Sequence, residues 1–174
     1  MEDQQKPTNK TALNYGVYLG IASILISVIL FALGKQYEQD WKNGVISFVI
    51  MATIIALGIK KFKELNGGFL TLGQGLKTGI AIALIGGVIS IVYTLIFMNF
   101  IEPDFMEKSM ELARQKMLDN PNLSEEQMEQ AIEMQKKFSG PAMIAAFGLI
   151  WTLFLGFIIS LISSLIMQKK ENEY

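Results

Sequence analysis

Four stretches of this chain carry no Asp, Glu, Lys or Arg over lengths that suit a helix crossing a lipid bilayer. They cover residues 11–34, 43–59, 78–101 and 138–168, and contain 24, 17, 24 and 31 residues. Such a helix needs roughly 20 apolar residues, within a range of about 17 to 25. The shortest stretch lies at the lower limit, but the Trp and Lys residues that flank it suit the membrane interface.

The sequence therefore predicts an all-α, polytopic membrane protein with four transmembrane helices. We expect a single four-helix membrane domain over residues 1–174, with spans at about residues 12–34, 42–60, 77–101 and 141–168. Residues 102–138, between spans three and four, are expected to form an extracytoplasmic helical hairpin.

Two other interpretations of the apolar stretches are less favourable. In a soluble protein, four buried core helices within 174 residues would leave too little polar surface, and only 18% of the residues are charged where about 25% is usual. The first stretch could also be a cleaved signal peptide. Its length exceeds the roughly 7–15 apolar residues of such a signal, so we expect a retained helix.

The basic residues predict the orientation. Lys and Arg concentrate on the cytoplasmic side of membrane proteins. Residues 1–10, 60–77 and 169–174 together carry eight Lys in three short segments, whereas the basic residues of the opposite side are outnumbered by carboxylates over 102–137. Both termini are therefore expected to be cytoplasmic.

The composition argues against several function classes. The chain has no Cys and no His, which removes disulfides, thiolate nucleophiles, the commonest general base and the commonest metal ligand. A net charge of −1 gives no reason to expect a nucleic-acid partner. No Asp, Glu, Lys or Arg lies in the central part of any span, although such residues usually mark proton relays and catalytic sites in membranes. We expect neither an enzyme nor a bound cofactor.

The segment between spans three and four is predicted to contain two short antiparallel helices. Pro103 suits the first turn of a helix, and residues 119–122 (Asp-Asn-Pro-Asn) suit a turn. Ser124 is placed to cap the second helix, with Gln127 at the capping-box position. That helix is expected to stop at residues 139–141. The carboxylates of both helices and of the residues before them are expected to form a solvated face: Glu102, Asp104, Glu107, Glu111, Glu125, Glu126, Glu129 and Glu133.

Five of the ten methionines lie in this hairpin. They could offer an adaptable surface to a partner, fill the seam between the two helices, or bind Cu(I) through their thioethers. Without His or Cys nearby, we expect no metal site. The candidate partner surface consists of Met106, Met110, Met117 and Met128.

Small residues spaced four apart along the spans are typical of close helix packing in membranes. The same stripes could instead line a path for a solute. The candidate packing residues are Gly16 and Gly20 in span one, Gly79, Ala83 and Gly87 in span three, and Gly148, Gly156 and Ser160 in span four.

Two further features concern the spans and their connection. The hydroxyl side chains within the spans are expected to satisfy one another or the helix backbone. Residues 60–77 are expected to place Phe62, Leu65, Phe69, Leu72 and Leu76 on one apolar face at the membrane interface, interrupted at Asn66-Gly67-Gly68.

Three stretches carry a resemblance to a known family. They are the glycine-containing loop at 66–77, the helix at 124–138, and the closing segment 147–160 with its following Lys169-Lys170. With the overall layout, they resemble the domain-of-unknown-function family DUF4199, small four-pass membrane proteins of Bacteroidota. The resemblance implies location in the inner membrane. It implies no activity and no site residue.

These features favour a non-enzymatic membrane protein that acts as a partner-binding or scaffold subunit. Its partners would be the lipid bilayer and a membrane protein, a periplasmic protein or a second copy of the chain. The alternative is a small-solute transporter or channel that acts as an oligomer and uses its hydroxyl and glycine faces.

Overall fold

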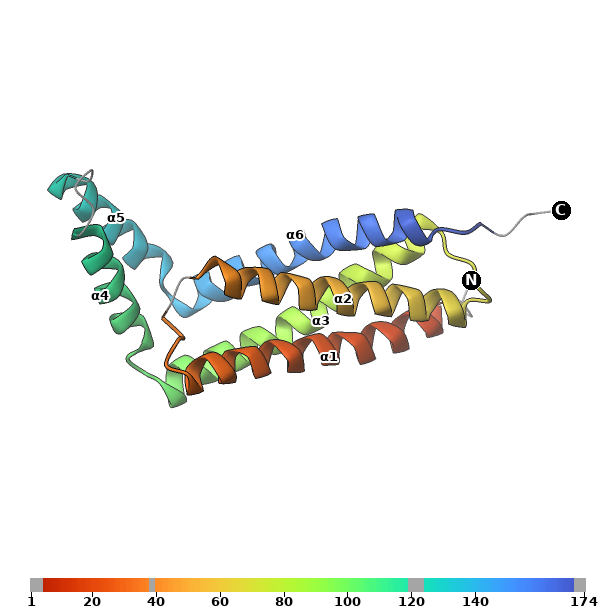
Figure 1. The fold of residues 1–174 in the computed structure, drawn as a ribbon, viewed down its shortest axis with the longest axis horizontal. Helices are drawn as coiled ribbons and strands as arrows, with labels where there is room; N and C mark the ends of the chain where they lie inside the picture. Colours follow the sequence, from red (N-terminus) through yellow and green to blue (C-terminus); the bar gives the residue numbers. More distant parts are fainter. Residues whose placement is uncertain (1–4, 38–39, 119–123, 171–174) are drawn as a thin grey trace.

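A computed structural model describes residues 5–37, 40–118 and 124–170 (Figure 1). This part of the chain is all-α. The helices are α1 (Gln5–Ala32), α2 (Trp41–Leu65), α3 (Leu72–Ile96), the π-helical turn η1 (Phe97–Ile101) that continues α3, α4 (Phe105–Leu118), α5 (Glu125–Phe138) and α6 (Pro141–Met167). The predicted fold class is confirmed.

Four of these helices are long and apolar enough to cross a membrane. The spans cover residues 9–32, 41–65, 72–101 and 141–167, with mean hydropathies of 2.2, 2.0, 2.5 and 2.4. The second span runs past the expected end at residue 60 to Leu65, because the intervening Lys and Glu residues are good helix formers. The protein is therefore a multi-pass membrane protein by length and composition.

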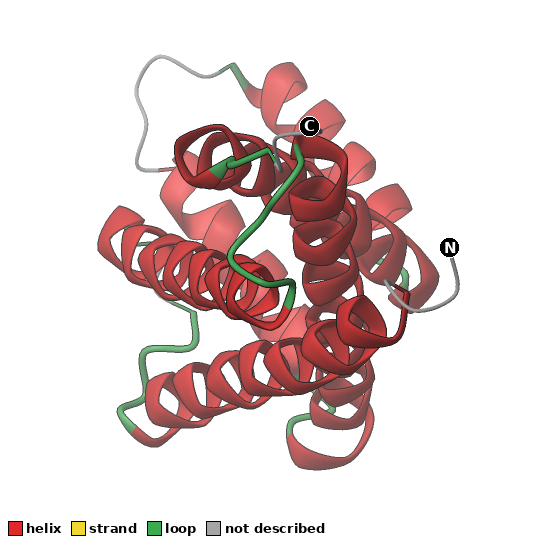
Figure 2. Ribbon diagram, turned by 90° about the vertical axis from the view of Figure 1, so that its right-hand side faces the viewer, coloured by secondary structure: helices red, strands yellow, loops and turns green. Residues whose placement is uncertain are grey.

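The four long helices form a bundle in which α3 is central. It packs along α1 on one side and α6 on the other, while α2 contacts α1, α3 and α6. Figure 2 views this bundle from the end at which both chain termini lie. We call this end the tail end. The opposite end, from which α4 and α5 project, is the hairpin end (Figure 1).

The packed core lies in the half of the bundle next to the tail end. The buried residues of α2 run from Met51 to Phe62, and those of α6 run from Gly156 to Ser164. In α3, which runs in the opposite direction, they lie between Gly75 and Gly87. No residue of α2 before Met51 or of α6 before Gly156 is buried. The helices therefore close tightly at one end and separate toward the other.

The connection between α2 and α3 differs from the expected interfacial segment. Phe62 is fully buried in the core, so it cannot belong to an apolar face at the membrane surface, and that expectation is wrong. Gly67 and Gly68 have positive φ angles of 67° and 86°, which favour glycine and allow the chain to turn here. Thr71 then caps α3 through a capping box with Gln74.

The tail end is closed by contacts between this connection and the chain after α6. Leu70 and Lys169 exchange two backbone hydrogen bonds of 2.9 Å. The Lys63 ammonium donates to the Met167 carbonyl at 2.8 Å, which places a positive charge at the negative end of the α6 dipole. Lys169 also lies 5.7 Å from the centre of the Phe69 ring.

The helical hairpin of α4 and α5 is present as predicted. The capping box of Ser124 and Gln127 is confirmed, and α5 ends at Phe138, one residue before the predicted stop. The helix α4 begins at Phe105, so Pro103 precedes it and does not lie in its first turn. The predicted turn at residues 119–122 lies outside the described residues. The two helices contact each other and project from the bundle.

Candidate functional site

Two predicted small residues of α1 lie directly against α3. A Cβ atom added at Gly16 would lie 2.6 Å from the Ile85 Cβ, and one added at Gly20 would lie 2.6 Å from the Ile89 Cγ2. Real Cβ atoms do not approach side-chain carbons so closely. Both positions therefore require glycine unless the two helices separate.

The predicted small residues of α3 meet α6 at two levels. A Cβ atom at Gly79 would overlap the Ser160 side chain, which is fully buried. A Cβ atom at Gly156 would overlap the Ala83 methyl group. One turn further along α3, at Gly87, the approach loosens, because a Cβ there would be 3.2 Å from the Thr152 Cγ2.

Gly148 occupies a different environment from Gly156. It is exposed, and nothing lies within 4 Å of a Cβ atom built on it. The reason is its position in the hairpin half of α6, where the helices have begun to separate. It lines a small cavity of about 150 Å³ together with Gly87 and Thr152.

The separation of the helices leaves two adjoining cavities in the hairpin half, which together we call the wedge cavity. One has a volume of about 330 Å³ and the other about 310 Å³, and both are lined by Ser23 of α1 and Ser47 of α2. The first extends toward η1, where Phe97 and Phe105 line it. The second extends toward the core, where buried Met51 forms part of its closed end.

Four of the hydroxyl groups that line the wedge cavity share one hydrogen-bonding state. Ser23, Ser47, Ser90 and Thr94 each donate at 2.9 Å to the backbone carbonyl four residues earlier in their own helix. A hydroxyl has one proton and two lone pairs, so these four oxygens are left as acceptors. For these four residues this agrees with the expectation that span hydroxyls satisfy one another or the helix backbone. Ser164 of α6 departs from that expectation, because its hydroxyl is buried without a hydrogen-bond partner among the described residues.

The polar cluster at the mouth of the wedge cavity is centred on Glu102. This residue directly follows η1 and is only 9% exposed. Its carboxylate accepts hydrogen bonds from the Tyr37 hydroxyl, from Gln36 Nε2 at 3.3 Å and from Lys108 Nζ at 3.0 Å. The expectation that Glu102 belongs to a solvated face is therefore wrong. Three donors from two separate segments surround it.

A series of packed aromatic rings connects this cluster to the helix bundle. The Tyr37 ring stacks on Phe105 with 5.3 Å between ring centres. Phe105 makes an edge contact with Phe97, which in turn contacts Phe31 at 5.3 Å. The α1–α2 connection is thus fastened to the start of the hairpin by one buried carboxylate and by stacked rings.

The hydrogen bonds shift the pKa values of the three charged or ionisable partners. The bond from Tyr37 is the main cause that lowers the pKa of Glu102 from 4.5, with Lys108 acting in the same direction. Burial, followed by the bond to the ionised Glu102, raises the pKa of Tyr37 above 10.0. The bond to Glu102 also raises the pKa of Lys108 above 10.5.

These shifts predict how the cluster responds to pH. The lowered pKa of Glu102 means that its stabilisation is present above pH 4.5 and is lost as the pH falls through the lowered value. The raised pKa values of Tyr37 and Lys108 mean that their stabilisation is present below about pH 10 and is lost above it. The difference in Tm between wild type and E102Q should be constant between about pH 6 and 9 and should shrink below pH 4.5. A difference that stays unchanged at pH 3 would contradict this assignment.

The four methionines predicted as a partner surface lie on both hairpin helices. Met106, Met110, Met117 and Met128 are all half-buried. The most exposed apolar side chains of the hairpin are instead Leu118 and Met134, each 61% exposed. Among the described residues, no group of three or more Asp, Glu, His or Cys side chains is arranged to hold a metal ion.

A comparison with family models decides the classification. Residues 14–169 match the family described as "Protein of unknown function (DUF4199)". The chain belongs to this family. The match covers most of the first span, the other three spans and the hairpin of this DUF4199 protein, as the resemblance in the sequence led us to expect. Searches of curated proteins and of solved structures find no match.

Proposed function

We propose that this DUF4199 protein is a non-enzymatic membrane subunit that binds a protein partner through its hairpin. The observation that carries the proposal is that the four-helix bundle does not cover α4 and α5. These helices pack on each other and project beyond the bundle, and no residue of α4 is buried. An ordered, capped hairpin that the bundle does not cover is suited to contact another protein.

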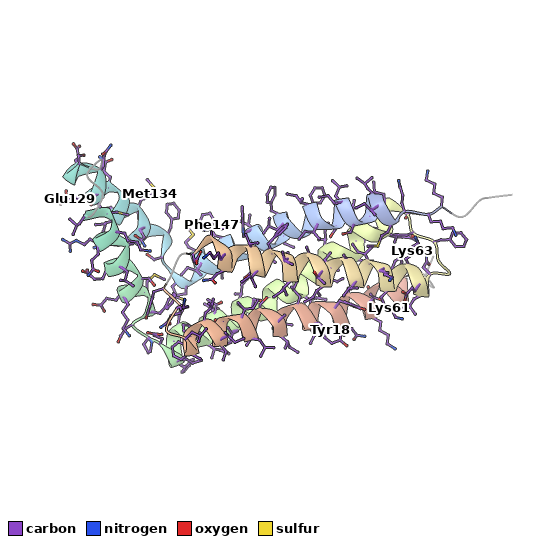
Figure 3. The ribbon with its side chains drawn as sticks, in the orientation of Figure 1. Tyr18, Lys61, Lys63, Glu129, Met134 and Phe147 are labelled. Atoms are coloured by element: carbon purple, nitrogen blue, oxygen red, sulfur yellow. The ribbon has the colours of Figure 1, made fainter. Side chains whose placement is uncertain are left out.

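The exposed apolar side chains of the hairpin support this proposal. Leu112, Leu118 and Met134 are each at least 37% exposed, on helices that otherwise carry mostly charged and polar residues. Figure 3 shows Met134 and Glu129 on the projecting hairpin, at the opposite end of the molecule from Lys61 and Lys63. Aromatic and Met side chains are enriched where proteins meet, and Met adapts to irregular surfaces.

The positions of the basic residues support the location that we propose for the protein. We place the protein in the inner membrane with both termini and the α2–α3 connection in the cytoplasm, and with the hairpin outside. Lys60, Lys61 and Lys63 lie in the last turns of α2 at the tail end, where positive charge is retained on the cytoplasmic side. The partner would then be a membrane or periplasmic protein or a second copy of the chain.

Site-specific photocrosslinking in living cells tests the partner proposal. A photoreactive amino acid at Met134 should give a discrete adduct of one defined mass. The same group at Lys136, which is exposed two residues later and so faces the opposite side of α5, serves as the matched control. We expect adduct formation at Met134 to be at least fivefold stronger. A protein that purifies as a lone monomer and gives no adduct at Met134, Met110 or Met128 would contradict the proposal.

The wedge cavity favours a second candidate function, transport of a small solute. It is closed toward the tail end by the packed core and reaches the mouth beside Glu102, as a carrier open to one side would be. A transporter should show solute flux in liposomes, whereas a partner-binding subunit should show none. We favour the partner-binding function because no Asp, Glu, Lys or Arg lies in the central part of any span to couple transport to an ion gradient.

A further inference from the structure

We propose that the wedge cavity is a binding site for a small uncharged molecule with several O–H or N–H donors, a polyol by chemical class. This inference goes beyond partner binding and does not depend on whether the bound molecule is also transported. It depends on the hydrogen-bonding state of the cavity wall, on the absence of charge there, and on the position of the cavity in the bundle.

The wall of the wedge cavity carries four hydroxyl oxygens that can accept hydrogen bonds, because each of these hydroxyls already donates its proton to a backbone carbonyl. Ser23, Ser47, Ser90 and Thr94 direct their protons to carbonyls in their own helices, at 2.9 Å in each case. A fifth acceptor, Gln36 Oε1, is buried beside the same cavity without a hydrogen-bond donor. A buried acceptor without a donor costs free energy, so a ligand that brings donors is favoured.

Five acceptors from three helices and the α1–α2 connection therefore line the two adjoining cavities. Ser23 belongs to α1, Ser47 to α2, and Ser90 and Thr94 to α3, while Gln36 follows α1. A ligand with one donor would satisfy only one of them. A molecule with several hydroxyl groups can satisfy several at once, which is why we assign a polyol.

The absence of charged residues in the cavity wall argues against a cation or an anion as the ligand. None of the described residues that line either part of the wedge cavity is charged. A cation or anion placed there, within the apolar region of the spans, would lose hydration without gaining a counter-charge. Glu102 and Lys108, at the mouth, pair with each other at 3.0 Å.

The remaining walls fit the carbon skeleton of such a ligand. Phe97 and Phe105 line the mouth side, and Leu155 and Trp151 line the deeper side. The volumes of about 330 and 310 Å³ lie at the lower end of the range for small-molecule sites. Mostly apolar walls with a few convergent polar groups are typical of such sites.

Saturation-transfer NMR on the full-length protein in nanodiscs tests this assignment, with erythritol as the probe. We expect signal transfer to erythritol from the wild type and a loss of at least tenfold in the S23A/S47A/S90A variant. The matched control is T53A. Thr53 is, like Ser47, an exposed residue of α2 whose hydroxyl donates to its own helix, at 2.7 Å, but it does not line either part of the cavity. This control should leave the signal unchanged.

Two ligand controls and one labelling experiment complete the test. 1,2,3-Trimethoxypropane, which has acceptors only, and glycerol 3-phosphate, which is charged, should give no transfer. Because the chain has no cysteine, S47C can be labelled alone, and erythritol should slow its modification by a maleimide but not that of T53C. The labelling experiment changes only one serine at a time. It therefore remains decisive if the triple variant does not fold. Equal transfer from the ether, no transfer from erythritol, or equal protection of both cysteines would overturn the assignment.

Discussion

Replacing Gly156 with alanine is expected to lower the free energy of unfolding by about 1–3 kcal/mol. The new methyl group would overlap the Ala83 methyl group across the contact between α6 and α3. Both residues are buried, and the neighbouring positions Ser160 and Ile82 are fully buried, so the helices have no free space to absorb the extra atom. The measurement is unfolding in mixed micelles with increasing SDS, followed by Trp fluorescence.

Gly148 provides the matched control for this prediction, since it has the same residue type on the same helix. Nothing lies within 4 Å of a Cβ atom there, so G148A should change the stability by less than about 0.5 kcal/mol. The A83G substitution in the G156A background should restore most of the loss, because it moves one methyl group from α3 to α6 across the same contact. A double variant as unstable as the sum of the two single variants would contradict the geometry.

Replacing Glu102 with alanine is the second change with a large expected effect. Without the carboxylate, the Tyr37 hydroxyl and the Gln36 amide lose their shared acceptor in a half-buried site. We expect a loss of about 1–3 kcal/mol. The release of the α1–α2 connection should also increase its cleavage by trypsin at Lys35.

Two substitutions separate this effect from a general loss of charge. E107A removes a carboxylate from the exposed part of α4 and should be nearly neutral. K108M removes the exposed partner of the ion pair and should destabilise the protein much less than E102A, since surface ion pairs contribute little. If E102A and E107A have the same stability and the same rate of cleavage, Glu102 does not hold the connection.

The sequence was sufficient to predict the features that depend on local pattern. The length of an apolar stretch decides whether a helix can span the bilayer. Ser124 and Gln127 lie only three residues apart, and together they form the capping box that marks the start of α5. Both predictions are confirmed. The family resemblance was also sufficient for the classification.

The polar cluster and the wedge cavity could not be predicted in the same way. Glu102 meets Tyr37 across 65 residues of chain, and nothing in the local sequence distinguishes it from its exposed neighbours Asp104 and Glu107. The sequence feature that could have distinguished Glu102 is its position directly after an uncharged span. The glycine stripe of α6 likewise continues past Gly156 to Gly148, although only Gly156 meets α3 closely. Where two helices begin to separate depends on tertiary packing, which residue spacing does not determine.

In this account the four spans close tightly in the tail half and separate around the wedge cavity in the hairpin half. The most direct test is the modification rate of single Ser→Cys variants by a water-soluble maleimide in nanodiscs. The chain has no other cysteine. Variants at Ser23 and Ser90, which line the wedge cavity, should react at least tenfold faster than variants at Ser160 and Ser164, which are fully buried. Equal rates at all four positions would show that the bundle is packed uniformly, and the account would be wrong.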